Sequence, residues 1–374
     1  MSSSIDPLRK RFLRAGWRCL QTLIALFPRK SKALVIWYGG AFAGDVGGPL
    51  VKVKRLQKYF PETRVGYSVV YALSNTPYLS SLALTVLRWR RVPIVLNQNG
   101  VYYGGWFDGD WRAKNREMAR AWHAAEYVFC QSEFCRECAH RFLGKRSGPT
   151  EILFNAVDID HFSPLSETEH LIRAERRPVF LLTGKIDDHM FYRVDATVRG
   201  FHRACSRGLD AELRLSGWMS PNVKDMTNDL ITDLGLADRV IITGPYRQEE
   251  APEIYRAADI YIMLKHNDPC PNTVIEALSC GLPVLFSNSG GVPELAIGMA
   301  GRALPVSEGF DKNHVPTMEH IAEGMIDIVR DLPERRKAAR KRAEDAFDLR
   351  KWIERHKIVF HSLHGATVKE PSQL

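Results

Sequence analysis

The sequence predicts an α/β protein made of two doubly wound, Rossmann-like domains. Three observations predict this class: a length of 374 residues, two series in which short apolar runs alternate with helical stretches, and a turn-rich, charged break between the series. Chains longer than about 250–300 residues usually divide into more than one hydrophobic core. Strands that alternate with helices are typical of parallel sheets covered by helices on both faces.

The composition is that of a soluble globular protein, with 45% hydrophobic and 25% charged residues. The formal net charge of +9 will draw the chain to polyanions, such as nucleic acid, an anionic membrane surface or phosphate-bearing ligands. A solvated basic surface is an equally open interpretation. The sequence contains no recognisable nucleic-acid-binding motif, so we expect no nucleic-acid partner.

The seven cysteines are odd in number, as expected for reduced thiols in a cytoplasmic protein rather than for a disulfide framework. Cys130, Cys135 and Cys138 lie close together, but they lack the two paired C-x2-C segments of a zinc knuckle. We therefore expect these thiols to be packed in the interior and to bind no metal.

Residues 1–30 form a separate basic segment. Its basic residues alternate with apolar ones and are Arg9, Lys10, Arg11, Arg14 and Arg18. The apolar run that follows, 20–27, is shorter than the ~20 residues that a transmembrane helix needs. Two interpretations stay open: an amphipathic helix on the anionic inner face of the cytoplasmic membrane, or a helix packed on the protein. The first would make this a cytoplasmic, peripherally membrane-associated protein.

The predicted first domain, residues 31–164, begins with a strand at 33–38, a glycine loop at 39–48 and a helix at 49–59. Further short apolar runs predict strands at 65–70, 94–97, 127–131 and 151–154, with helical stretches between them. A turn-rich stretch, 155–164, closes the domain. The charged stretch after it, 165–177, contains few apolar residues, so the break predicts an inter-domain linker.

The predicted second domain, residues 165–349, repeats the alternation. Strands are expected at 179–183, 211–216, 240–243, 260–264 and 283–287, and helices at 194–207, 227–234, 249–257 and 273–280. The charged tail, 333–361, is helical by composition. Two such series predict two domains that face each other across a cleft.

The segment from Asp268 to Glu276 is the most informative for function. A strand is expected to end near Leu264, a proline-containing loop carries Asp268, and a helix begins at about Asn272, a good N-cap residue. The free N–H groups and positive end of that helix can stabilise a diphosphate without a metal. Glu276 can accept hydrogen bonds from a ribose diol, and Asp268 can hold sugar hydroxyls. Alone, either carboxylate would be a capping or solvated acid, but the combination predicts a sugar-nucleotide site.

This segment resembles the E-x7-E signature of the retaining glycosyltransferases of family four, with Asp268 in place of the first glutamate. The resemblance extends through 238–244, 255–264, 276–295 and the linker 155–164, and more loosely to Gly47-Gly48-Pro49. It implies the GT-B fold, in which two Rossmann-like domains face each other and a C-terminal helix, here 350–363, crosses back to the first domain.

The resemblance also implies residue roles at the donor site. Glu276 would bind the ribose and Asp268 the transferred sugar, and the amides of Thr273 and Val274 would hold the diphosphate. The backbone of the loop residues Cys270, Pro271 and Asn272 would flank the sugar. The loop 244–247, which contains Tyr246, would recognise the base.

This sequence departs from the family pattern at two places. After Gly184, Lys185 can replace the arginine that the family supplies to the diphosphate, but Tyr192 occupies the position of the family's lysine. Arg193 is adjacent and is the candidate substitute, although a helical neighbour points about 100° away. In the first domain, Gln98 and Asn99 replace an acceptor-facing histidine, and neither can act as a general base near neutral pH.

The resemblance predicts a metal-independent transferase with no cofactor. Its donor would be a nucleotide sugar and its acceptor a glycan or lipid-linked molecule, in cell-surface polysaccharide or lipopolysaccharide synthesis. A non-catalytic protein that binds a nucleotide sugar or assists a partner enzyme is the alternative. The aromatic residues after Asn99 are expected either in an acceptor groove or in the core; they are Tyr102, Tyr103, Trp106, Phe107 and Trp111.

Overall fold

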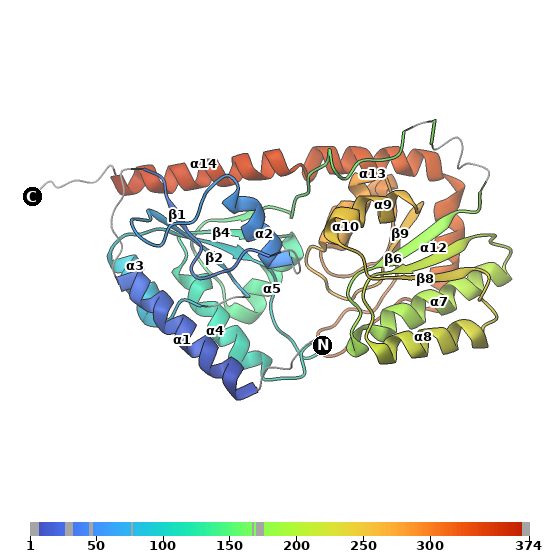
Figure 1. The fold of residues 1–374 in the computed structure, drawn as a ribbon, viewed down its shortest axis with the longest axis horizontal. Helices are drawn as coiled ribbons and strands as arrows, with labels where there is room; N and C mark the ends of the chain where they lie inside the picture. The colour runs from blue at the N-terminus through green and yellow to red at the C-terminus, as the bar shows by residue number, and fades with distance from the viewer. Residues whose placement is uncertain are drawn as a thin grey trace, which may run out of the picture. The chain divides into compact units, whose positions relative to one another are not determined.

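The computed structural model describes residues 7–26, 33–44, 48–75, 78–166, 168–169 and 176–368. The chain forms two compact units, the first from Met1–Leu153 with Trp352–Leu374 and the second from Phe154–Lys351. Each unit contains one sheet whose described strands are all parallel. The prediction of two α/β domains with parallel sheets is therefore confirmed (Figure 1).

The first sheet has the strand order β1-β2-β3-β4-β5. Its strands are β1 (Ile36–Trp37), β2 (Val69–Leu73), β3 (Ile94–Gln98), β4 (Tyr127–Cys130) and β5 (Thr150–Ile152). Every residue of β2 and β3 is buried, because helices cover both faces of a parallel sheet and no face is left for polar side chains. The helices are α1 (Pro7–Leu26), α2 (Gly48–Gln57), α3 (Ser81–Trp89), α4 (Trp111–Ala124) and α5 (Glu133–Leu143).

The last helix, α14 (Leu349–Val368), belongs to the first unit from Trp352 onward. In Figure 1 it runs along one side of the first sheet, and α1, α3 and α4 lie on the other side. His356 of α14 is fully buried, and its ring centroid lies 4.6 Å from that of Phe129. The guanidinium group of Arg355 binds the Glu151 carboxylate, with Nε 2.7 Å from Oε1. The predicted return of a C-terminal helix is thus observed.

The second sheet has the order β11-β10-β9-β6-β7-β8. Its strands are β6 (Val179–Thr183), β7 (Glu212–Ser216), β8 (Val240–Gly244), β9 (Ile260–Met263), β10 (Val284–Ser287) and β11 (Gly301–Leu304). One face packs against α7 (Phe191–Ser206), α8 (Pro221–Asp233) and α12 (Met318–Arg330). The other packs against α9 (Ala251–Arg256), α10 (Asn272–Ser279), α11 (Val292–Leu295) and α13 (Leu332–Ala346). Short 3-10 turns are η1 (Asp188–Met190), η2 (Gln248–Glu250) and η3 (Gly298–Ala300).

Some predicted boundaries were wrong. The strand expected at 65–70 is β2, Val69–Leu73, and neither β11 nor α12 was expected. The tail expected to be helical over 333–361 consists of two helices, α13 and α14. The chain leaves the helical conformation between them because its backbone pairs with another segment: Val157 N–H donates to the Phe347 carbonyl (2.9 Å) and Leu349 N–H to the Val157 carbonyl (3.0 Å).

The basic N-terminal helix α1 packs on the first unit. Gln21 and Ala25 are buried, and the indole N–H of Trp17 donates to the carbonyl of Gly40 at 3.0 Å. The hydroxyl of Tyr67 donates to the carbonyl of Ile24 at 3.2 Å. The packed alternative is therefore observed for this helix. Every helix in the described part of the chain is too short or too polar to cross a bilayer.

Candidate functional site

The loop that carries Asp268 is held in one conformation by its neighbours. Asn267 adopts the left-handed region with φ 54°, which asparagine tolerates better than most residues, and its side-chain amide donates to the Gly309 carbonyl at 2.7 Å. The Gly291 N–H donates to the Asp268 carbonyl at 2.9 Å. A Cβ at Gly290 would lie 2.5 Å from that carbonyl oxygen, so only glycine lets the two chain segments approach this closely.

The Asp268 carboxylate has a cationic partner. Its Oδ2 lies 2.8 Å from Nζ of Lys265, and its Oδ1 accepts the Cys270 amide at 3.2 Å. Sequence reasoning missed Lys265. The available signal was a lysine three residues before the acid, directly after the strand that became β9. The pair makes Asp268 an oriented acceptor rather than a freely solvated acid.

Helix α10 begins at Asn272, as expected, but its N-cap is Pro271, in an extended conformation, and no side chain caps the helix. The prediction of Asn272 as N-cap was therefore wrong by one residue. Without a side-chain cap, the first N–H groups remain available to a ligand. The Val274 amide already donates to the Pro271 carbonyl at 3.2 Å, so the Thr273 amide is the better candidate for a phosphate oxygen.

Glu276 lies inside the second unit, only 9% exposed. The hydroxyl of Tyr255 donates to its Oε2 at 2.9 Å. Burial raises the pKa of Tyr255 well above its ordinary value, and the negative charge of Glu276 acts in the same direction. The same two causes raise the pKa of Tyr246, which shares a 2.7 Å hydrogen bond with Thr183. Two neutral phenols therefore lie beside one carboxylate, and Tyr255 fixes its orientation.

The remaining loop residues support this arrangement. Cys270 is buried, its carbonyl accepts the Asn155 side-chain amide at 2.8 Å, and its sulfur accepts the Asn155 N–H at 3.3 Å. These bonds connect the loop that is predicted to flank the sugar to the turn-rich segment at 155–164. The predicted donor residues from Asp268 to Glu276 thus lie in one contiguous loop and helix.

The cation expected at the diphosphate is exposed. Nζ of Lys185 lies 3.3 Å from the Asp187 carboxylate and 4.9 Å from the ring centroid of Trp218. Gly184, before it, has φ 133°, a conformation that favours glycine. Lys185 therefore lies on the surface at the end of β6, where an exposed ion pair and the Trp218 ring contact its ammonium group.

Tyr192 and Arg193 lie in different surroundings, one beside the Asp268 loop and the other in the interior. The Tyr192 hydroxyl accepts the His266 amide at 3.3 Å, so it supports the loop that leads to Asp268. Arg193 is only 4% exposed, and its positive charge acts on the phenols of Tyr192 and Tyr261, opposing the rise in pKa that burial causes in each. Arg193 is therefore part of the interior beside Tyr192, not an exposed cation.

In the first unit, Gln98 and Asn99 are held in a polar network. The Gln98 side-chain amide donates to the Gly100 carbonyl at 2.6 Å. Asn99 Oδ1 accepts Nζ of Lys52 at 2.8 Å, and its Nδ2 donates to Asn75 Oδ1 at 3.1 Å. Lys52 is only 2% exposed, and sequence reasoning missed it because a lysine on a helix usually lies at the surface. Gly48 begins α2, and Gly47 lies outside the described residues.

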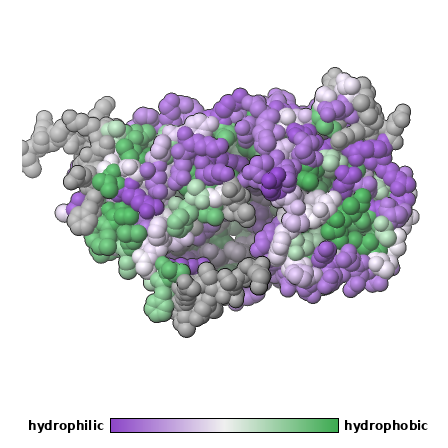
Figure 2. All heavy atoms as spheres, viewed as in Figure 1, coloured by the Kyte–Doolittle hydropathy of each residue, from purple (hydrophilic) through white to green (hydrophobic). Residues whose placement is uncertain are grey.

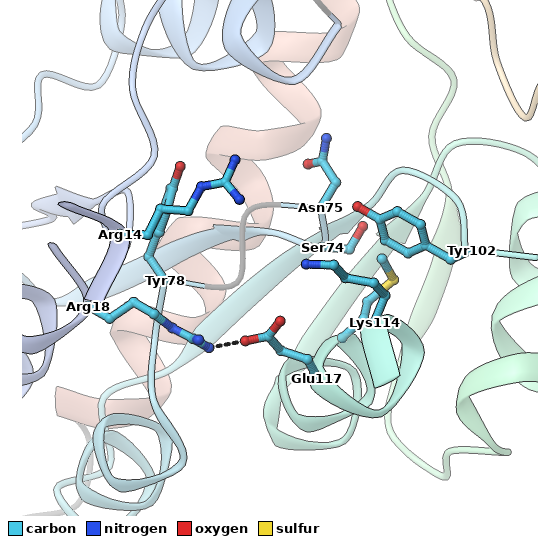
Figure 3. Close-up of a pocket in the computed structure, with 9 residues that line it drawn as sticks. Arg14, Arg18, Ser74, Asn75, Tyr78, Tyr102, Lys114 and Glu117 are labelled. Carbon is cyan, nitrogen blue, oxygen red and sulfur yellow. Dashed lines mark hydrogen bonds and ion pairs between the residues drawn. The ribbon is translucent and has the colours of Figure 1, made fainter. Parts of the chain in front are cut away.

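A polar pocket of about 210 Å³ opens beside this network (Figure 3). Side chains from α1, α4 and the segments after β2 and β3 line it, among them Arg14, Asn75, Tyr102 and Lys114. Gln98 and Asn99 do not line it, but Asn99 is hydrogen-bonded to Asn75, which does.

The aromatic residues after Asn99 divide between the pocket lining and the interior of the first unit. Tyr102 lines the pocket and stacks on Trp106, with ring centroids 5.1 Å apart. Tyr103 is buried, and Trp111 packs edge-on against Phe142 at 5.9 Å. Only part of the aromatic segment is therefore available to a ligand.

Among the residues that the structure describes, no three His, Cys, Asp or Glu side chains are grouped so that they could hold a metal ion. Cys130, Cys135 and Cys138 are buried and free. Burial raises the pKa of Cys130 and Cys138 to about 12. These thiols are protonated at neutral pH and act as packing residues.

Residues 169–346 match the family model described as "Glycosyl transferases group 1". This range contains the whole Asp268 loop, helix α10 and Lys185. The match therefore falls on the unit that carries the predicted donor residues.

Two curated proteins illustrate the sequence similarity. Mannosylfructose-phosphate synthase from Agrobacterium fabrum is 30% identical over 165 residues, which cover 41% of this chain and 36% of that protein. D-inositol 3-phosphate glycosyltransferase from Mycobacteroides abscessus is 31% identical over 149 residues, which cover 38% and 32%. The chain thus spans about a third of the length of these relatives.

Solved structures share the fold over more of the chain. HepE from Anabaena, in complex with UDP, has a TM-score of 0.64 and 17% identity, and the match covers 93% of this chain and 96% of that one. Sucrose-phosphate synthase from Thermosynechococcus elongatus has a TM-score of 0.60 and 18% identity, over 84% and 77%. At these identities the likeness establishes the fold, which is the GT-B fold expected from the sequence.

Proposed function

We propose, from the premise that residues 169–346 belong to the group 1 glycosyl transferases, that this protein is a retaining glycosyltransferase. It moves a sugar from a nucleotide-sugar donor to a glycan or lipid-linked acceptor in cell-surface polysaccharide or lipopolysaccharide synthesis. The observation that carries the proposal is a pair of oriented carboxylates, one on the loop and one on the helix that follows it. Lys265 orients Asp268, and Tyr255 orients Glu276.

The donor would be bound by the second unit. Glu276 would accept hydrogen bonds from the ribose, and the uncapped N-terminus of α10 would receive the diphosphate. The chemical demand is to stabilise the negative charge that develops on the departing diphosphate. Lys185 and the Thr273 amide would do this, and Asp268 would hold the sugar hydroxyls. We expect no metal, no cofactor and no dedicated protein nucleophile.

The names of similar proteins suggest which donors and acceptors to test first. HepE was solved with UDP and with UDP-glucose, so uridine donors are the first to test. The names of the two curated relatives both contain a phosphorylated sugar or polyol, so phosphate-bearing acceptors belong in the first panel.

We also propose that α1 brings the protein to an anionic membrane surface. One face of α1 packs on the first unit, and the opposite face exposes Phe12 (77%) and Leu13 (61%). On the neighbouring helix α3, Trp89 is 78% exposed. Figure 2 shows hydrophobic side chains over α1 and α3. Arg88 directly precedes Trp89 and Arg91 lies two residues after it, and both are exposed. Apolar side chains with basic neighbours suit an anionic bilayer.

A donor screen tests the proposed activity. We expect calorimetry to show binding of at least one UDP-, GDP- or ADP-sugar, and product analysis to show release of the nucleotide with the sugar transferred or hydrolysed. Binding without any turnover would instead favour a non-catalytic protein. Tyr192 supports this alternative, because it occupies the position of a cation and its hydroxyl accepts the His266 amide. Absence of both binding and turnover would refute both functions.

A further inference from the structure

We infer that the pocket between α1 and α4 binds the phosphate group of the acceptor. The inference rests on the proposed function and names the chemical class of its second substrate. The pocket lies wholly within the first unit, and the predicted donor residues lie in the second. It is therefore a separate anion site from the one expected at α10.

The charges that line the pocket match a phosphate monoester. Arg18 forms an ion pair with Glu117, so these two charges cancel. Arg14 and Lys114 form no ion pair within the described part of the chain, and both reach into the pocket (Figure 3). Two uncompensated positive charges face a group that carries about −1.5 to −2 at neutral pH, whereas a carboxylate supplies only one negative charge.

Neutral donors complete the site. Asn75 presents its side-chain NH2 group, since its Oδ1 already accepts from Asn99 at 3.1 Å. Tyr102 presents its hydroxyl (Figure 3) and lines the same pocket as Arg14. Burial and the negative charge of Glu117 raise the pKa of this phenol, and the positive charge of Arg14 opposes the rise. The oxygens of a phosphate group accept hydrogen bonds from cationic and hydroxyl donors, and both kinds line this pocket.

The protein holds these donors in place before any ligand binds. Asn115, a buried residue of α4, clamps the backbone of Tyr102 from both sides: its Oδ1 accepts the Tyr102 N–H at 2.9 Å, and its Nδ2 donates to the Tyr102 carbonyl at 2.7 Å. Behind Asn75, the network continues through Asn99 to the buried ammonium of Lys52 at 2.8 Å. A buried positive charge behind the donors adds to the attraction for an anion.

Helix α1 supplies two of the cations that line the pocket. The helix turns Arg14 and Arg18 toward the pocket, while Phe12 and Leu13 point outward. An acceptor whose phosphate enters the pocket can carry either a lipid chain or a soluble sugar. Both sources share the phosphate chemistry, so the test compares them.

Calorimetry on the intact chain tests the inference with four probes: inorganic phosphate, glucose 6-phosphate, farnesyl phosphate in detergent micelles, and glucuronate. Each probe is titrated with and without the nucleotide sugar found in the donor screen. We expect both phosphate monoesters to bind and glucuronate to bind at least about tenfold more weakly, because it lacks the second charge. Tighter binding of farnesyl phosphate would identify a lipid-linked acceptor, and tighter binding of glucose 6-phosphate a soluble one.

The double variant Arg14→Gln, Lys114→Gln should bind the phosphate monoesters about a hundredfold more weakly, at about tenfold for each charge-assisted contact. The control, Arg116→Gln with Arg120→Gln, changes two exposed cations of α4 outside the pocket lining and should match the wild type. Arg14→Lys with Lys114→Arg should retain most of the affinity. If the double variant unfolds at a lower temperature than the wild type, the affinities of the two single variants for phosphate monoesters are measured instead.

Equal phosphate affinity in the wild type and the Arg14, Lys114 variant would refute the inference that the pocket binds phosphate. Glucuronate binding as tight as that of glucose 6-phosphate would refute it too. Failure of the proposed function looks different: the wild type would bind no nucleotide sugar at all, whatever its affinity for glucose 6-phosphate. The two failures therefore give separate results in the same set of titrations.

Discussion

Single side chains decide how the donor carboxylates are presented. Glu276 is buried and receives the Tyr255 hydroxyl at 2.9 Å, and Asp268 pairs with Lys265 at 2.8 Å. In both cases the partner uses one carboxylate oxygen and orients the group for a ligand. The partners are therefore as informative for testing the site as the carboxylates.

Glu276→Ala should abolish nucleotide-sugar binding measured by calorimetry, because the ribose loses its acceptor. Tyr255→Phe should weaken donor binding by about tenfold or more, since a hydrogen bond to a charged group contributes about 1.5–3 kcal/mol. Tyr127→Phe is the matched control, because its hydroxyl also donates to a carboxylate, that of Glu151, but in the first unit. Unchanged affinity in Glu276→Ala would refute the ribose assignment.

Lys265→Met should lower kcat/KM by about tenfold or more, because Asp268 loses the ion pair that orients it. Lys265→Arg should recover part of this loss, and Lys224→Met, at an exposed lysine of the same unit, should have little effect. Steady-state transfer rates provide the measurement. A rate for Lys265→Met equal to the wild type would show that the pair is only structural.

At the scale of elements, α1 has two different faces. One face packs on the first unit through Gln21 and Ala25, and the other exposes Phe12, Leu13 and Leu23. Deletion of this helix would uncover the surface beneath it. Substitutions on its outward face are therefore the cleaner test of membrane binding.

Phe12→Glu with Leu13→Glu should strongly reduce sedimentation with vesicles that contain phosphatidylglycerol, because the apolar contact is lost and negative charge is added. The control is Ile297→Glu with Met299→Glu, a pair of exposed apolar residues in the second unit. Equal sedimentation of both variants and the wild type would contradict the role of α1.

Helix α14 contributes a pH-sensitive contact to the first unit. Burial lowers the pKa of His356 to about 3, whereas the unfolded chain has a histidine pKa of about 6.5. Between these values the unfolded chain binds more protons, so stability falls as the pH falls below about 6.5. The loss attributable to this residue is about 2 kcal/mol between pH 7 and pH 5.

Hydrogen exchange of the α14 amides, corrected for intrinsic rates, measures this loss at pH 7 and pH 5. We expect His356→Gln to be less protected at pH 7 but to change less between the two pH values than the wild type. His361→Gln, at an exposed histidine of the same helix, should follow the wild type. The same pH response in all three proteins would exclude His356 as its source.

At the scale of the whole molecule, the net charge of +9 should govern association with membranes. Exposed charges are screened over about 10 Å at 0.1 M salt and about 3 Å at 1 M. Sedimentation with anionic vesicles should therefore decrease steadily as sodium chloride is raised, and neutral phosphatidylcholine vesicles should bind little at any salt concentration. Salt-independent sedimentation would indicate that apolar contact alone holds the protein.

The sequence by itself determined the fold class and the donor segment. Strand, loop and helix follow one another within residues 260–279, so local spacing was enough to predict them, even though the N-cap was Pro271 and not Asn272. The roles of Glu276 and Asp268 came from the family resemblance and stay predictions.

Only the tertiary structure decided which side chains meet. Arg14, Asn75 and Lys114 line one pocket although they are far apart in the chain, and His356 shares a hydrogen bond with Tyr71, 285 residues away. Such contacts depend on how helices pack on a sheet, which periodicity along the chain does not encode. The same reason explains why Lys52, a helical lysine, is buried, and why Tyr255 is the residue that holds Glu276.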